Sequence, residues 1–329
     1  MRARDAILDL FDLNKELTIK EIVDRTDFSK QMAHYAINQL MEAKMIERVG
    51  HRPKTIYRRL QPTLPATQLQ RLHNFTDADI ALLDDNFLIV TETGKLLQGV
   101  AAFQHWCWQR SLRPDPTFLE YKLTRDRYAG YYDSNGFIDA LGKLKNTKGY
   151  DKIWLDQFYY LDFYAIERFG MTRIGSLVNH AKQGQNRFLM RILTESIINQ
   201  LNFFLEEMEA DAVGFIPPTI PREIQLMKFL QTHLDIYLPE VKIRKITDIV
   251  PVAQSSLSKL DERIKNAENS YAVTDLRRFN HLVLIDDAAF SGATLNQVAA
   301  KIRIKGIAGK VTGLAVVGSP KGMDVIADK

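Results

Sequence analysis

Cysteine is nearly absent from this sequence. Cys107 is the single cysteine among 329 residues, so the chain forms no internal disulfide and no cysteine-cluster zinc site. This cysteine usage suits a reducing compartment, and we expect a cytoplasmic protein. The seven histidines also lack the His-x-x-x-His spacing of helical zinc sites. The sequence therefore assigns no direct protein ligand to a metal.

Long apolar runs and a strong net charge are missing as well. No stretch approaches the roughly 18 apolar residues of a membrane-spanning helix, and the N-terminal residues predict an amphipathic helix instead of a signal peptide. We therefore expect no membrane partner. The formal charge is only +4, so a local basic patch is needed to indicate nucleic-acid binding. Internal repeats and low-complexity segments are also absent.

Residues 1–62 predict a small helical unit that ends in a hairpin. Apolar residues recur at helical spacing near the start, Thr18 and Glu21 have the spacing of a capping box, and Ser29 can cap a third helix. Two strand-like segments follow within residues 46–60. Three helices followed by a basic hairpin resemble a winged helix-turn-helix, which implies contact with DNA or RNA.

The third helix and the hairpin carry the residues that we expect to contact nucleic acid. Polar side chains on the helix that can reach base edges or phosphates are Lys30, Gln31, His34, Tyr35 and Asn38. The hairpin concentrates cations that suit backbone phosphates, with no acid among them: Arg48, Arg52, Lys54, Arg58 and Arg59. The alternative use of such a unit is protein contact or dimerisation, with a merely solvated basic edge.

Residues 63–149 carry few readable signals and stay unassigned as an intermediate α+β region. Residues 87–90 predict a strand, and residues 93–110 predict a helix with one buried face. We expect Pro114 and Pro116 to break this helix.

From residue 150 onward, helical segments alternate with short apolar strands. We expect helices over residues 189–205, 224–233 and 295–302, and strands over residues 212–216, 282–285 and 311–317. This alternation predicts an α/β fold with a parallel sheet and helices on its faces. The ligand site of such a sheet lies beyond the carboxyl ends of its strands. We assign residues 150–329 to this domain.

The segment His281–Thr294 joins an apolar strand to two acids and a helix start. Asp286 and Asp287 end the predicted strand, and a turn of small residues leads into the helix. Backbone N–H groups converge at such a helix start and can hold a phosphate, while Gly292 lets the backbone approach closely. The two carboxylates can accept hydrogen bonds from sugar hydroxyls and place Mg²⁺ through water. An ordinary strand–turn–helix connection with surface acids is the alternative.

This segment resembles the phosphoribosyl-pyrophosphate (PRPP) loop of the type I phosphoribosyltransferases. Its order is four apolar residues, two acids, three free positions, Ser/Thr, Gly, one free position and Ser/Thr. The resemblance implies a Rossmann-like phosphoribosyltransferase domain in which the acids Asp286 and Asp287 are catalytic and hold the ribose hydroxyls. It implies that the 5′-phosphate is held by Ala288, Ala289, Phe290, Ser291, Gly292, Ala293 and Thr294, and that Mg²⁺ accompanies PRPP.

Further segments resemble the ComF-type phosphoribosyltransferases, namely residues 180–184, 214–218 and 250–273. Cations in or beside these segments are the candidates for binding pyrophosphate: Arg222, Lys182, Lys259 and Arg263. The chain departs from this family in two ways. It lacks the cysteines of the zinc ribbon that often precedes ComF domains, and Arg222–Gln225 stands near the place of the usual Arg-Gly-Phe-Asn-Gln segment. The base-recognition side of the site is therefore not specified.

Two classes of function follow from these features. In the first, an enzyme transfers ribose phosphate from PRPP, or performs related glycosidic chemistry, while the winged helix places it on nucleic acid or a partner. In the second, the pocket only senses PRPP and regulates DNA binding, as in purine-operon repressors. The domain combination also resembles effectors of bacterial retron systems, which act in antiviral defence. A homodimer or larger assembly is expected for either class.

Overall fold

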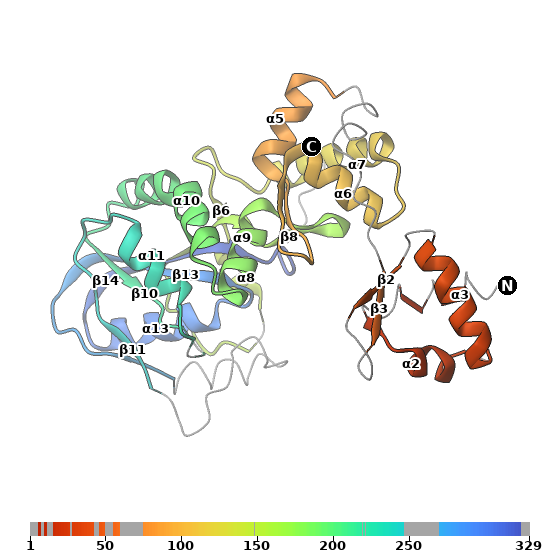
Figure 1. Ribbon diagram of the computed structural model, residues 1–329. Coiled ribbons are helices and arrows are strands. Elements are labelled where there is room, and N and C mark those ends of the chain that lie inside the picture. The colour runs from red at the N-terminus through yellow and green to blue at the C-terminus, as the bar shows by residue number, and fades with distance from the viewer. Residues whose placement is uncertain are drawn as a thin grey trace. The chain divides into compact units, whose positions relative to one another are not determined.

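The computed structural model describes residues 6–7, 10–11, 16–26, 28–42, 46–49, 55–59, 75–147, 149–218, 220, 222–246 and 270–323. The chain divides into two compact units, Met1–Asn74 and Phe75–Lys329. Figure 1 shows the first unit in red and the second in colours from orange to blue. Among the described helices, none has both the length and the apolar character needed to cross a membrane.

The first unit combines short helices with a three-stranded antiparallel sheet. Its described elements are β1 (Glu16–Leu17), α2 (Ile19–Asp24), α3 (Lys30–Glu42), β2 (Ile46–Val49) and β3 (Ile56–Arg59), with the strands in the order β1-β3-β2. Thr18 and Glu21 form the predicted capping box at the start of α2. The Ser29 hydroxyl accepts a hydrogen bond from the Met32 N–H at 3.2 Å. Both predicted helix starts and the hairpin are confirmed.

The first unit has a hydrophobic core of its own. Ile7 and Phe11, which lie in helical residues at the start of the chain, pack there with Ile22 of α2, Ile37 of α3 and Tyr57 of β3. One face of α3 is buried in this core, so the polar residues of α3 lie on its other, exposed face. This arrangement decides which side chains of α3 are available to a partner.

A five-stranded mixed sheet lies at the centre of the second unit, in the order β10-β13-β14-β7-β6. Four strands are parallel: β10 (Ala212–Phe215), β13 (Phe279–Ala289), β14 (Ala308–Gly318) and β7 (Gln157–Phe163). The edge strand β6 (Ile138–Asp139) is antiparallel to β7. The predicted α/β fold is thus confirmed, and its strands include one from the region that the sequence left unassigned.

Helices cover both faces of this sheet. Alternate residues of a strand point to opposite faces, so Val283 and Ile285 of β13 join one core cluster while Leu282 and Leu284 join another. The first cluster includes α9 (Arg173–Gln183), α10 (Arg187–Glu207) and α11 (Leu226–His233). The second includes α8 (Leu141–Asn146) and α13 (Ala293–Ile304). The predicted helices over 189–205, 224–233 and 295–302 correspond to α10, α11 and α13.

The region of residues 77–129 contributes mainly to the second of these clusters, although its Leu88 belongs to the first. Its elements are α5 (Asp77–Asn86), β4 (Leu88–Val90), β5 (Leu96–Gln98), α6 (Gly99–Gln109) and α7 (Pro114–Ala129). Aromatic side chains pack this region against the sheet. The ring of Tyr128 on α7 contacts that of Phe163 on β7 edge-on, with centroids 5.2 Å apart. Two hairpins complete the unit, β8 (Ala165–Ile166) with β9 (Gly170–Met171) and β11 (Ile243–Lys245) with β12 (Tyr271–Val273), and the 3₁₀ turn Glu167–Phe169 joins β8 to β9.

Two local predictions for this region need correction. The helix expected over residues 93–110 begins only at Gly99, because Leu96–Gln98 pair with β4 in a hairpin. Pro114 opens α7, since the first turn of a helix does not use the N–H that proline lacks. The prolines therefore mark the start of a second helix as well as the end of the first.

Candidate functional site

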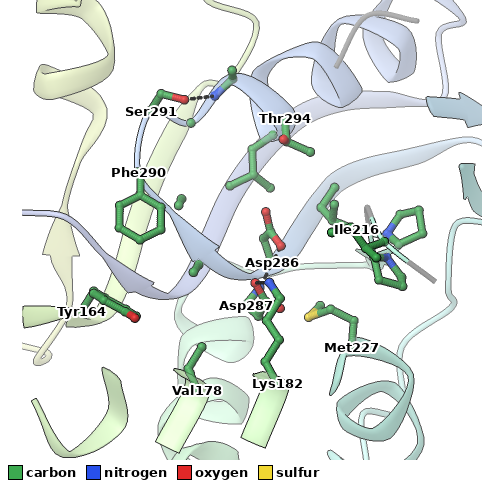
Figure 2. A pocket seen from close by; sticks show the side chains of 18 of the residues that line it. Tyr164, Val178, Lys182, Ile216, Met227, Asp286, Asp287, Phe290, Ser291 and Thr294 are labelled. Carbon is green, nitrogen blue, oxygen red and sulfur yellow. Dashed lines mark hydrogen bonds and ion pairs between the residues drawn. The ribbon is translucent and has the colours of Figure 1, made fainter. Parts of the chain in front are cut away.

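A cavity of about 390 Å³ opens at the carboxyl ends of β10 and β13. Its lining comes mainly from three segments that lie far apart in the sequence, namely α9, the residues that follow β10, and Asp286–Leu295, and Tyr164, Met227 and Tyr271 complete it. Figure 2 shows these side chains converging on one space. The position agrees with the expectation that ligands bind beyond the carboxyl ends of parallel strands.

The two adjacent acids turn to opposite faces of the sheet, because they are consecutive residues of a strand. Asp287 points to α9, where Lys182 Nζ lies 2.8 Å from Asp287 Oδ1 and 2.7 Å from Asp287 Oδ2. Asp286 points toward Thr294 in the first turn of α13 (Figure 2). Its Oδ1 accepts the backbone N–H of Asp287 at 2.8 Å. Both acids line the cavity, yet only Asp287 is neutralised by a lysine among the described residues.

These surroundings raise the pKa of both Asp286 and Lys182. Burial and the neighbouring charge of Asp287 raise the pKa of Asp286 to about 7, although Lys182 opposes that shift. Burial alone would lower the pKa of the Lys182 ammonium, but Asp287 and Asp286 raise it above its usual range. Lys182 therefore stays charged, and burial beside the Asp287 charge favours the protonated form of Asp286.

The loop after the acids begins later than the sequence predicts. β13 continues through Ala289, because Ala288 pairs with Val317 and Ala289 with Gly318 of β14. The expected turn directly after Asp287 is therefore wrong, and the loop is confined to Phe290, Ser291 and Gly292. Gly292 has a φ of +75° and forms the N-cap of α13.

The start of α13 presents backbone donors to the cavity. The first hydrogen bond of the helix runs from the Asn296 N–H to the Gly292 carbonyl at 2.9 Å. Within the described part of the chain, the N–H groups of Thr294 and Leu295 have no acceptor, and both residues line the cavity. Free N–H groups and the positive end of a helix dipole form a suitable site for a phosphate.

A second layer supports this loop from behind. The Tyr150 hydroxyl donates to the Ser291 carbonyl at 2.7 Å, and Lys143 Nζ donates to the Ser319 carbonyl at 2.6 Å. A Cβ atom on Gly292 would lie 3.0 Å from Leu144 Cδ1 and 3.1 Å from Phe158 Cε1. No motif marks these supports in the sequence, because Lys143 and Leu144 lie in the weakly patterned region before residue 150, and Tyr150 and Phe158 follow it outside any motif.

The remaining walls differ in character. Beyond β10 the cavity is lined by Pro217, Pro218 and Arg222, and Arg222 Nη2 donates to Gln183 Oε1 at 2.9 Å. Near the end of β7, Tyr164 faces Phe290, with ring centroids 5.4 Å apart. No sequence pattern had pointed to Tyr164. Its contribution depends on the position of β7 in the sheet.

Of the four pyrophosphate candidates, two can be placed. Lys182 and Arg222 both line the cavity, although Lys182 is engaged by Asp287. Lys259 and Arg263 lie outside the described residues. The structure thus brings residues 286–294, which the sequence predicts to bind PRPP, together in one cavity with both candidate cations that can be located.

The nucleic-acid candidates lie in the first unit. Lys30, Gln31, Tyr35 and Asn38 are exposed on α3, His34 is half-buried, and Arg48 is exposed on β2. Arg58 lies 2.8 Å from Glu16 and 4.0 Å from Glu47, so acids offset its charge. Arg52, Lys54 and the side chain of Arg59 lie outside the described residues.

A magnesium ion fits this donor set only together with a ligand. Among the described residues, no group of three or more His, Cys, Asp or Glu side chains could hold a metal. Asp286 nevertheless offers a carboxylate to the cavity. Mg²⁺ commonly uses one or two carboxylates plus phosphate oxygens and water, so Asp286 suits an ion that arrives with a pyrophosphate.

Comparison with known proteins leaves the assignment to the motif and the geometry. A scan against protein-family models gives no match, and neither does a search of the curated proteins.

Proposed function

We propose that the second unit binds Mg²⁺–PRPP and transfers its phosphoribosyl group, as an enzyme that resembles the type I phosphoribosyltransferases of the ComF kind. The observation that carries the proposal is the ion pair between Lys182 and Asp287, which are 105 residues apart. Two segments that resemble the family independently, residues 180–184 and 281–294, meet in one cavity. The alternative interpretation, an ordinary strand–turn–helix connection with surface acids, does not explain why these two segments line the same cavity.

The 5′-phosphate, the ribose and the pyrophosphate of PRPP each have suitable partner groups in the cavity. The 5′-phosphate suits the free N–H groups of Thr294 and Leu295 together with the Ser291 and Thr294 hydroxyls. The ribose hydroxyls suit Asp286, which keeps acceptor capacity, whereas Asp287 shares its oxygens with Lys182. Pyrophosphate suits Lys182 and Arg222, because its several charges require cations.

In the proposed reaction, the bond between ribose C1 and the pyrophosphate oxygen breaks, and pyrophosphate leaves with the electron pair. A lone pair of the acceptor forms the new bond to C1, and the acceptor's proton passes to solvent. Mg²⁺, when bound, offsets the charge of the leaving group. The Asp286 carboxylate lies where it can stabilise positive charge on the ribose, so positioning and electrostatics supply the catalysis.

The first unit is proposed to place this enzyme on DNA or RNA in the cytoplasm as a winged helix. The exposed polar residues of α3 support that role, as does Arg48, which has no acidic partner among the residues that the structure describes. The combination resembles retron effectors, and a role in antiviral defence is part of the proposal. A regulator that only senses PRPP uses the same cavity and is the alternative.

Pyrophosphate release from Mg²⁺–PRPP tests the enzyme, with a bacterial small-molecule extract as the source of acceptors. We expect release by the wild type and its loss in Asp286→Asn and in the double variant Asp286→Asn, Asp287→Asn. Asp126→Asn, on the exposed face of α7, is the matched control and should retain activity. Thermal unfolding of each variant separates loss of chemistry from loss of fold.

The alternative gives a different result in the same assay. If pyrophosphate is not released while calorimetry still detects PRPP binding, the sensor is supported and the enzyme is not. If neither release nor binding occurs, the proposed function is wrong.

A further inference from the structure

Three segments of the second unit, around β11, around β12 and in the second half of α13, concentrate positive charge. Residues 241–246, 270–280 and 300–310 carry three, two and four Lys or Arg residues. Asp275 is the one acid in these ranges, all of which the structure describes. The formal net charge of the whole chain is only +4, so the composition of these segments differs clearly from the average of the chain.

Hydrogen bonds hold the three segments side by side. β11 and β12 form an antiparallel hairpin in which Arg244 pairs with Ala272. From the second half of α13, Lys305 Nζ donates to the Val273 carbonyl of β12 at 2.7 Å. Cations that are far apart in the sequence therefore lie on neighbouring elements of the fold.

Some of these cations are neutralised by acids of the same chain. Arg277 Nη2 lies 2.6 Å from Asp275 Oδ2, and Arg303 Nη1 lies 3.7 Å from Asp156 Oδ2. These two pairs offset their own charge and leave little of it for a partner.

Four other cations keep their charge available, and we call them the basic ridge: Lys242, Arg244, Arg278 and Lys305. All four are exposed, and none has an acidic partner within ion-pair distance among the residues that the structure describes. Alternate residues of an extended segment point to the same side, so Lys242 and Arg244 project together, whereas Ile243 packs against the core.

The basic ridge offers a partner charge more than apolar area. The large apolar residues exposed in these segments, Ile246, Leu276 and Ile304, come singly from the three different segments, which is ordinary for a protein surface. A protein partner obtains most of its binding energy from a few buried anchors. A nucleic-acid backbone instead carries a negative charge at every phosphate and binds through cations alone. The ridge therefore fits nucleic acid better than an acidic protein segment.

We propose that the basic ridge is a second nucleic-acid surface, which holds the phosphate backbone of DNA or RNA on the second unit. This goes beyond the proposed function, in which only the first unit contacts nucleic acid. Because the two units belong to one chain, a nucleic acid held by either unit is presented to the other at a raised effective concentration.

Fluorescence anisotropy of the full chain tests the surface, with a duplex DNA and a duplex RNA of the same sequence at several salt concentrations. The triple variant Lys242→Ala, Arg244→Ala, Arg278→Ala should weaken binding. It should also reduce the slope of log affinity against log salt by about 3, or about 1 for each lost phosphate contact. Lys305 is left in place because its ammonium also bonds to β12.

A second triple variant, Lys95→Ala, Arg113→Ala, Lys145→Ala, is the matched control. It removes the same number of charges from exposed positions outside the ridge, and we expect it to change the slope by less than about 1. None of the six substituted residues lines the cavity, so both triple variants should release pyrophosphate from Mg²⁺–PRPP at the wild-type rate. Thermal unfolding checks that both are folded.

The outcomes separate this surface from the proposed function. If the ridge variant keeps the affinity and slope of the control, the second nucleic-acid surface is wrong, and an acidic protein becomes the candidate partner of the ridge. A loss confined to one duplex supports the surface and identifies DNA or RNA as its ligand. If the ridge variant loses slope while the wild type never releases pyrophosphate, the surface stands and the proposed enzyme falls.

Discussion

Lys143 illustrates how one buried charge affects this fold. Only 7% of its surface is exposed, and its ammonium donates to the Ser319 carbonyl. No carboxylate lies within ion-pair distance of Lys143 among the residues that the structure describes. Burial lowers its pKa to about 8, because the charged form loses hydration without gaining an opposite charge.

Replacing Lys143 by methionine should therefore stabilise the protein at pH 7. We expect the free energy of unfolding to rise by about 2 kcal/mol, since a shift of one pKa unit corresponds to about 1.4 kcal/mol and the lost hydrogen bond offsets part of the gain. Between about pH 8 and pH 10.5, the unfolded wild type keeps a proton that the folded wild type has lost. Wild-type stability thus rises with pH across that window, and the advantage of the variant should shrink.

Urea unfolding at pH 7 and at pH 10 measures this difference. Lys145→Met, at an exposed position of the same helix, is the control and should change stability by less than about 0.5 kcal/mol at either pH. A Lys143→Met variant that is less stable than the wild type at pH 7 would show that the hydrogen bond to Ser319 outweighs the cost of burial.

The loop and the helix α13 form a single element whose geometry depends on glycine. Gly292 has a positive φ, which costs a residue with a Cβ atom roughly 1–2 kcal/mol. That atom would also press on Leu144 and Phe158, both of which lie behind the loop. The cost of a side chain at this position therefore has a backbone part and a packing part.

Gly292→Ala should lower the free energy of unfolding by about 2 kcal/mol and weaken ribose 5-phosphate binding at least tenfold, because the N–H groups at the start of α13 shift. Gly306→Ala separates the two parts: Gly306 has a φ of +64° and nothing within 4 Å of an added Cβ atom. We expect it to cost about 1 kcal/mol and to leave binding unchanged. Equal binding by both variants would mean that the loop does not hold the phosphate.

For the whole molecule, the first unit provides the expected link to nucleic acid. Lys30 and Arg48 are exposed, and among the described residues neither has an acidic partner within ion-pair distance. Arg58, by contrast, has its charge offset by Glu16 and Glu47. The net charge of the chain conceals this contrast between compensated and uncompensated cations.

Lys30→Ala combined with Arg48→Ala should weaken binding of a duplex oligonucleotide and reduce the slope of log affinity against log salt by about 2, or about 1 for each phosphate contact. Arg58→Ala should change the slope by less. Fluorescence anisotropy at several salt concentrations measures both values. An unchanged slope in the double variant would favour the use of this unit for protein contacts.

The sequence by itself determined the elements whose signals are local. The cap at Thr18 and the alternation of apolar strands with helices from residue 150 depend on spacing along a few residues, and the structure has the elements that they predict. The PRPP-loop motif lies in one continuous segment, so its candidate residues could all be named in advance. The winged-helix identity and the roles of these residues stay predictions.

Only the tertiary structure decided what depends on the order of strands in the sheet. It paired Lys182 with Asp287, which lies 105 residues away, and extended β13 beyond both acids through its pairing with β14. It also brought Tyr164 and Tyr150 to the loop from regions without a motif. These contacts join residues far apart in the chain, and no local spacing encodes which strand lies next to which.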